Sequence, residues 1–180
     1  MKMVASITLT ELRNICTNLS PIQCDFYSEG AVVALESQEH VSGIGITVDG
    51  DFNENIPLTW DIKPNTNGWK EGRDSTEFGA LAIAFFLVTS LTEYQVIEQS
   101  PIGTGFDYYL GYQEEHPDYD PDNFINAWLE VSGLAKGTPS EISDRVREKM
   151  VRIEKTGAVT MPGYVSVTAF GRPISYLKKK

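Results

Sequence analysis

Two segments with alternating apolar and polar residues do most to limit the folds open to this chain. In residues 125–133, a period of two puts Glu130 on the same face as Trp128 and Ser132. In residues 106–110, the same period separates Asp107 from its apolar neighbours. Two adjacent strands of this kind would bring one aspartate and one glutamate onto a common face. A carboxylate pair so placed can hold a divalent metal ion.

The N-terminal part of the chain predicts one short helix followed by strands. Apolar residues recur at helical spacing over residues 8–19, and Pro21 is expected to end that helix. Alternation and turn signals such as Asp49-Gly50 then favour an antiparallel, β-rich segment. The predicted strands are 25–27, 31–36, 43–48 and 56–61.

The remainder predicts helices that cover a sheet. Residues 78–88 are apolar on nearly all sides, which indicates a helix buried on more than one side, and Asp74 with Glu77 resembles a capping box at its start. A strand at 94–99 precedes the two alternating segments. A helix from residue 139 follows, with an apolar stripe and a charged outer face that includes Lys149. The last predicted strand is 164–170, and the C-terminal lysines read as a solvated tail.

This order of elements predicts an α/β fold with a mixed central sheet flanked by helices. The domain organisation expected is an N-terminal helix plus β-rich extension over residues 1–74 and an α/β core over residues 75–180. At 180 residues the two parts are expected to form one compact domain overall.

Composition narrows the classes of function. The formal net charge of −10 disfavours a broad grip on nucleic acid, because such a grip depends on lysine and arginine. The longest apolar run, 78–88, is too short to span a bilayer, so no membrane association is expected. No secretory signal is visible, and Cys16 and Cys24 form neither a metal-binding spacing nor a disulfide framework. We therefore expect a cytoplasmic protein with free thiols.

Residues 75–171 resemble, in the order and length of their elements, the α-β-β-β-α-β core of the PD-(D/E)XK (restriction-endonuclease-like) nuclease superfamily. In that superfamily, acidic residues on the second and third strands bind Mg²⁺, and a glutamate of the first helix often joins them. The resemblance places Asp107 and Glu130 at the strand positions and Glu77 at the helix position. It implies Mg²⁺ or Mn²⁺ as cofactor, held by these three residues.

The chain departs from the superfamily at one position. The resemblance places a lysine two residues after the strand-three acid, where this sequence has Ser132. A serine has no charge with which to stabilise a developing phosphorane or to orient a hydroxide. Two other basic residues could take this role: Lys136 just after the strand, which we assign with Asp107 and Glu130 to catalysis, or Lys149 on the following helix.

Each acid also has a structural interpretation. Asp107 could belong to a turn after Gly105, Glu130 could pair with an arginine of the next helix, and Glu77 could serve only the capping box.

The leading functional hypothesis is a divergent metal-dependent nuclease, or a nuclease-like subunit of a DNA-acting assembly. In that assembly a protein partner would supply part of the grip on DNA, and homo- or hetero-oligomers are both compatible with it. The alternative is a catalytically inactive nuclease-like scaffold or protein-interaction module. An unrelated α/β binding protein is a third hypothesis.

Overall fold

The structure is a computed structural model that describes residues 5–156 and 160–180. In this part of the chain the α-helices are α1 (Leu12–Ile15), α2 (Pro21–Glu36), α3 (Gly72–Leu91) and α4 (Pro139–Thr156). The strands are β1 (Ile7–Thr8), β2 (Gly45–Gly50), β3 (Glu54–Thr59), β4 (Tyr94–Gln99), β5 (Tyr108–Tyr112), β6 (Ala127–Leu134), β7 (Gly163–Ala169) and β8 (Ile174–Lys179). Two short 3₁₀ turns, η1 (Leu9–Glu11) and η2 (Thr66–Gly68), complete the description.

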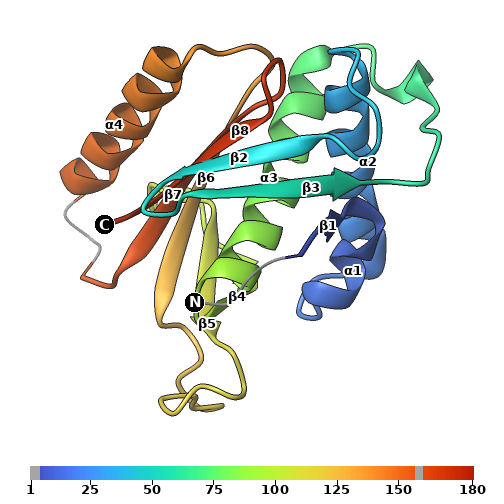
Figure 1. Cartoon of the computed structure of the whole chain (residues 1–180). Coiled ribbons are helices and arrows are strands. Elements are labelled where there is room, and N and C mark those ends of the chain that lie inside the picture. The colour runs from blue at the N-terminus through green and yellow to red at the C-terminus, as the bar shows by residue number, and fades with distance from the viewer. Residues whose placement is uncertain (1–4, 157–159) are drawn as a thin grey trace.

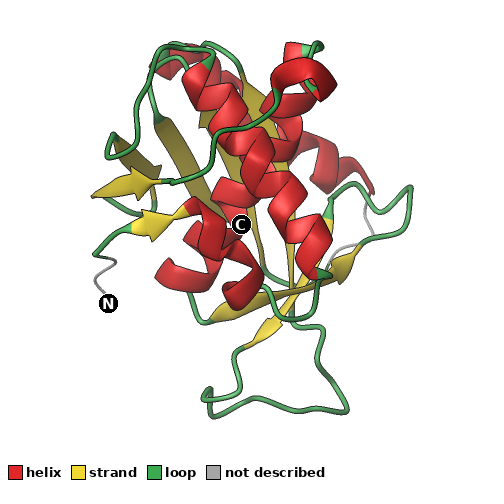
Figure 2. Cartoon of the chain, turned by 90° about the vertical axis from the view of Figure 1, so that its right-hand side faces the viewer, coloured by secondary structure: helices red, strands yellow, loops and turns green. Residues whose placement is uncertain are grey.

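All eight strands form one mixed sheet in the order β1-β3-β2-β8-β7-β6-β5-β4. Helix α4 covers one face of the sheet, and α1, α2 and α3 cover the other (Figure 1). Figure 2 shows the second face, with the helices in front of the strands. The predicted class, a mixed sheet flanked by helices, is therefore confirmed.

The sheet is built around a three-strand meander and one parallel crossover. Strands β4, β5 and β6 pair antiparallel in chain order. The chain then passes through α4 and returns as β7, which pairs parallel to β6. Two neighbouring parallel strands need such a crossover, because the chain must return to the end of the sheet where the first strand began. The C-terminal ends of β6 and β7 therefore point the same way.

The segment from Pro21 to Glu36 is one helix, so the strands predicted at 25–27 and 31–36 are wrong. Pro21 opens α2 instead of closing the helix before it, because a proline at the first helical position lacks only an N–H that would have no partner there. The hydroxyl of Ser20 caps the helix by accepting a hydrogen bond from the Gln23 N–H at 3.1 Å. Because α2 is buried from Gly30 to Leu35, its sequence shows no clean helical period.

The C-terminal segment also differs from the prediction. Residues 174–179 form β8, which lies between β7 and β2, so the C-terminal lysines are exposed, as predicted, but they do not form a free tail. Leu177 is buried, and Lys178 Nζ lies 2.6 Å from Asp51 Oδ1. The predicted antiparallel pairing in the N-terminal part is confirmed for β2 and β3. Because β8 joins β2 to β7, residues from both predicted parts share one sheet.

Helix α3 is buried on several sides, as predicted. It packs against α2 on one side and against the sheet on the other, so its length and composition, which alone would allow a membrane span, are those of a core helix. It begins at Gly72, and no side chain caps it. The predicted capping box is therefore wrong, and Glu77 instead accepts a hydrogen bond from Arg73 Nε at 2.9 Å.

Candidate metal and phosphate site

Asp107 and Glu130 come together where β5 begins beside β6. The Asp107 N–H donates to the carbonyl of Leu129 at 3.0 Å, and Asp107 Oδ2 accepts from the Val131 N–H at 2.7 Å. The aspartate is thus fixed to the strand on both sides of Glu130. A glycine at residue 105 with a φ of 90° makes the turn that leads into it. The common face predicted for the two acids is therefore confirmed.

Glu130 is an acid buried beneath α4. Its side chain is 1% exposed, and Lys149 Nζ donates to its Oε1 at 2.6 Å. A nitrogen of Arg152 lies 3.4 Å from the same oxygen. The other oxygen, Oε2, is buried and accepts no hydrogen bond from any residue that the structure describes. A buried carboxylate oxygen without a partner is costly, so this atom has unused capacity to bind a cation or a proton.

The two carboxyl groups interact directly. Burial, followed by the negative charge of Asp107, raises the pKa of Glu130 to about 7. The ion pair with Lys149 lowers the pKa, but it does not outweigh burial and the neighbouring charge. A proton on Glu130 can be donated to Asp107 in a hydrogen bond, which also favours the protonated form, whereas the ionised Oε2 has no donor among the described residues. At neutral pH Glu130 is therefore about half protonated. A metal ion bound between the two carboxyl groups could replace this proton.

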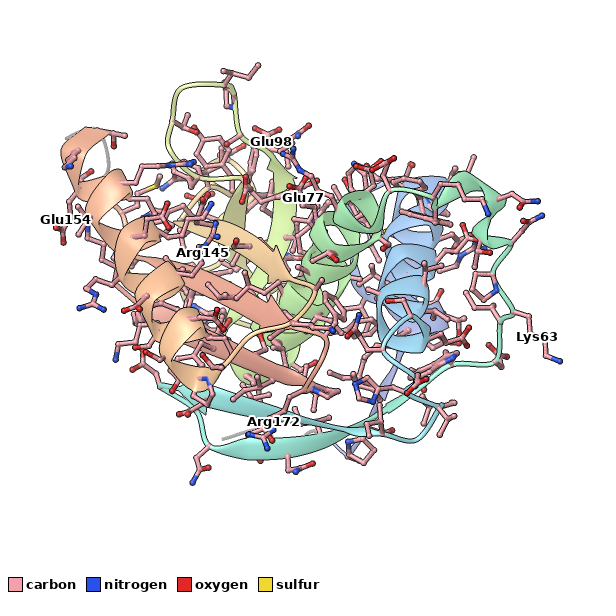
Figure 3. All side chains as sticks on the ribbon, turned by 90° about the horizontal axis from the view of Figure 1, so that it is seen from above. Lys63, Glu77, Glu98, Arg145, Glu154 and Arg172 are labelled. Atoms are coloured by element: carbon pink, nitrogen blue, oxygen red, sulfur yellow. The ribbon has the colours of Figure 1, made fainter. Side chains whose placement is uncertain are left out.

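A cavity of about 480 Å³ opens above this pair, between the N-terminal half of α3 and α4. Its charged lining consists of three carboxylates and three cations: Glu77, Asp107, Glu130, Arg145, Lys149 and Arg152. Figure 3 shows Glu77 projecting from α3 and Arg145 projecting from α4. Gly133 lets α3 approach β6 closely, because a Cβ there would overlap the carbonyl of Thr76. The cavity is thus neutral in formal charge, although the chain carries a net charge of −10.

The other predicted site residues are distributed unevenly. Glu77 lines the cavity, but its carboxylate is 53% exposed and paired with Arg73. Ser132 also lines the cavity. Lys136 does not lie among the cavity residues; it borders two separate hollows near the start of α4. Among residues 5–156 and 160–180, no group of three or more acidic, histidine or cysteine side chains is clustered for metal binding.

Lys149 lies in a different place from the one that the sequence predicted. We expected it on the outer face of the helix, yet its side chain is only 14% exposed and points to Glu130. The signal was present: Lys149 falls between Val146 and Ile153 at spacings of three and four residues, within the buried stripe of α4. A lysine inside an apolar stripe indicates a buried partner on the facing strand.

This set of side chains fits a hard divalent cation. Mg²⁺ is commonly held by one or two carboxylates, with water and substrate phosphate completing its octahedron. Asp107 and the unpartnered Oε2 of Glu130 supply such a pair. Arg145 and Arg152 line the same cavity and could contact an anion that the cation brings in.

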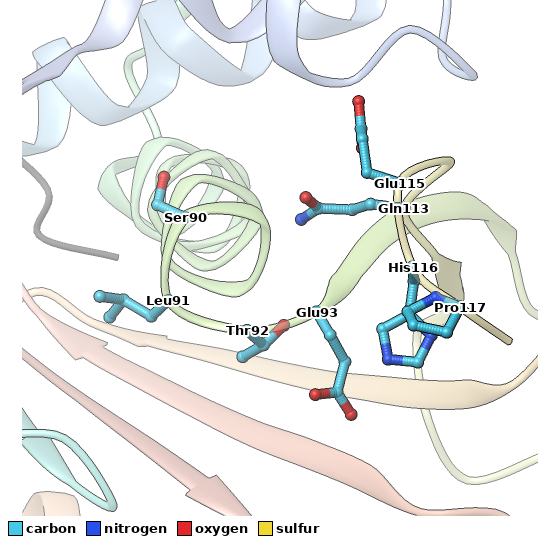
Figure 4. A pocket seen from close by; sticks show the side chains of 8 residues that line it. All are labelled: Ser90, Leu91, Thr92, Glu93, Gln113, Glu115, His116 and Pro117. Atoms are coloured by element: carbon cyan, nitrogen blue, oxygen red, sulfur yellow. The ribbon is translucent and has the colours of Figure 1, made fainter. Parts of the chain in front are cut away.

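A second, larger cavity of about 590 Å³ lies at the other end of α3. Figure 4 shows Ser90 and Leu91 on one side of it and Glu115, His116 and Pro117 on the other. Its acids are exposed, and His116 is stacked on Tyr112 with ring centroids 4.0 Å apart. The acids of this second cavity are solvated, whereas Glu130 is a buried acid. The cavity above Glu130 is therefore the better candidate site.

Glu130 should give the fold a distinct pH dependence. Its pKa is about 7 in the folded chain, against 4.5 for an ordinary glutamate, so between these values the folded state binds the extra proton. Its contribution to stability is therefore largest at low pH and is lost as the pH rises through 7, at up to about 1.4 kcal/mol per pH unit.

Thermal unfolding of the wild-type chain and of Glu130→Gln from pH 5 to pH 8 measures this effect. We expect the wild type to lose stability relative to the variant as the pH rises. A difference that is the same at every pH would contradict the assignment.

No family model, curated protein or solved structure matches this chain.

Proposed function

We propose that α3, β4, β5, β6, α4 and β7 form a restriction-endonuclease-like core, and that the cavity above Glu130 hydrolyses phosphodiester bonds with the help of Mg²⁺ or Mn²⁺. The antiparallel β4–β5–β6 meander and the parallel return to β7 through α4 support the proposed core. The observation that carries the function is the pairing of Asp107 with a buried Glu130 that has one unpartnered oxygen.

The side chains around the pair have complementary roles in this proposal. A bound Mg²⁺ would activate water and neutralise the phosphate. Lys149, held in place by Glu130, takes the role of the lysine that Ser132 cannot fill: it places a positive charge beside the reacting phosphate. Arg145 and Arg152 bind non-reacting phosphate oxygens from the α4 side of the cavity. Glu77 lines the same cavity and would join the metal only through water.

A nuclease with this composition needs help to hold DNA. The chain carries a net charge of −10, and three cations in one cavity cannot track a long duplex. We therefore propose that it acts as a subunit, with a protein partner or a second copy supplying further basic surface. A cytoplasmic location is part of the proposal, because both Cys16 and Cys24 are free thiols.

The second candidate function is a nuclease-like scaffold without activity. It is favoured by the ion pairs of Glu130 with Lys149 and Arg152, which match the structural interpretation of this glutamate. In that case the buried charges fix α4 on the sheet, and no metal enters.

A cleavage assay separates the two functions. The wild-type chain is incubated with supercoiled plasmid and with labelled oligonucleotides in MgCl₂, in MnCl₂ and in EDTA. The nuclease proposal expects nicking or shortening with either metal and none in EDTA. Intact DNA in all three conditions, at micromolar protein concentrations that offset the weak grip of the isolated chain on DNA, would refute the proposal that this chain cleaves DNA by itself.

A further inference from the structure

An aromatic platform lies next to the candidate site. Phe26 on α2 stacks on Trp69, with ring centroids 4.9 Å apart and an angle of 26° between the rings. Phe78 on α3 packs edge-on against Phe26, also at 4.9 Å. Phe26 is 43% exposed, whereas Trp69 is 8% exposed. The three rings come from separate segments, so their packing holds one exposed aromatic ring in a fixed position.

The platform is continuous with the cavity through one residue. Phe78 lines the cavity above Glu130, and the same ring contacts Phe26. The cavity thus has two unlike sides: α4 contributes cations, and α3 contributes the apolar side chains Phe78 and Leu81 beside the acidic Glu77. The α4 side includes Arg145, Lys149 and Arg152. A ligand that fits both sides carries a negative charge and a flat apolar group next to it, as a nucleotide does.

We infer that Phe26, held in place by Trp69 and Phe78, stacks on an unpaired base next to the phosphate in the cavity, so that the preferred substrate is single-stranded or locally unpaired nucleic acid. This inference rests on the proposed function and adds the class of substrate to it. In a continuous duplex both faces of each base are already stacked, so a protein ring can receive a base only after it has been unpaired. Stacking on aromatic rings also tolerates any base sequence.

The charge of the chain favours the same substrate. Duplex binding without base contacts depends on many neutralised phosphates, and a chain in which 25 acidic residues outnumber 15 basic ones repels a duplex over most of its surface. Stacking does not depend on charge, so it can supply affinity where phosphate contacts are few. With two or three cations at the site, the slope of log K against log salt should be only about −1.4 to −2.1 for a single strand.

The test is binding of a fluorescein-labelled 12-nucleotide single strand and of the matching duplex, measured by anisotropy in CaCl₂. Phe26→Ala should weaken single-strand binding by roughly 5- to 100-fold, the range expected for one stacked base, and leave duplex binding unchanged. Phe26→Trp should retain the affinity. Ile22→Ala is the matched control, because Ile22 is an exposed apolar residue one turn earlier on α2. It should bind both probes like the wild type.

Several results would overturn the inference. These are equal affinity for the two probes, an effect of Ile22→Ala as large as that of Phe26→Ala, or no binding of either probe. Melting temperatures of the variants exclude loss of the fold as the cause. The plasmid assay in MnCl₂ reports separately on the proposed function. If the chain cleaves DNA but Phe26→Ala does not change its single-strand affinity, only the inference about Phe26 is refuted. Single-strand binding that depends on Phe26, without any cleavage, defeats the nuclease alone.

Discussion

Replacing Asp107 with asparagine is expected to abolish metal-dependent cleavage and yet to leave the fold at least as stable as the wild type above pH 7. Cleavage should fall by at least about 10³-fold, more than the 10- to 100-fold typical of losing an outer-shell partner of a metal. Stability should hold because the asparagine oxygen can still accept the Val131 N–H, while the charge that opposes ionisation of Glu130 is gone.

Opposite effects on activity and stability would mark Asp107 as functional rather than structural. The measurements are cleavage rates in MnCl₂ and urea unfolding at pH 8. Asp118→Asn is the matched control, since it removes the same charge from an exposed residue of the loop between β5 and β6 and should change neither quantity. A variant that keeps full cleavage would refute the shared metal, and one that is strongly destabilised would support the turn-forming role of Asp107.

Replacing Lys149 with methionine should have the largest effect on stability. At pH 8 the change leaves Glu130, which is 1% exposed, either ionised beside Arg152, itself 56% exposed, or protonated at a pH where the unfolded chain holds it ionised. Breaking a buried ion pair from one side commonly costs about 3–5 kcal/mol, and we expect about 3 kcal/mol because Arg152 can compensate in part. At pH 5 Glu130 is protonated in both chains, so the loss should be smaller by up to about 1.4 kcal/mol, the cost of keeping a group of pKa about 7 ionised at pH 8.

Urea unfolding of Lys149→Met at pH 5 and pH 8 tests this expectation. Lys136→Met is the control, because Lys136 lies outside the cavity and is exposed. In the proposed nuclease, Lys149→Met also loses cleavage and Lys136→Met retains it, which would decide between the two basic residues that the sequence suggested. Unfolding of Lys149→Met at pH 8 with the wild-type midpoint would contradict the buried pair.

The parts of the structure that the sequence predicted are those where the two faces of an element carry different kinds of side chain. Residues 125–133 alternate because β6 has core side chains on both faces, with Glu130 on the α4 face, and this pattern placed Glu130 correctly. The apolar stripe of α4 was also correct, because that helix is exposed on its other side. Asp107 was located for a related reason: a carboxylate next to the first residue of a strand, in an alternating apolar segment, needs a partner.

The parts that the sequence did not predict lie where this contrast disappears. Helix α2 is buried along most of its length, so a period of 3.6 cannot be distinguished from a strand, and Pro21 carries both a stop and a start signal. Strand β8 was missed because lysines follow its short apolar part, and their partners lie far away in sequence, as Asp51 does. Contacts between Lys149 and Glu130 likewise depend on how α4 sits on the sheet.

The position of β8 has a consequence for the order of folding. Strand β2 pairs with β8 between Thr47 and Ile174, so two segments that are far apart along the chain must meet before the sheet is continuous. Bringing Thr47 and Ile174 together closes a long loop, and this loses chain entropy before the strand contacts form. Folding is slowed as a result. The β2–β3 hairpin presents an unpaired edge until then, and such an edge can pair with another chain. We therefore expect β8 to join the sheet late, and intermediates that lack it to be the species most prone to self-association.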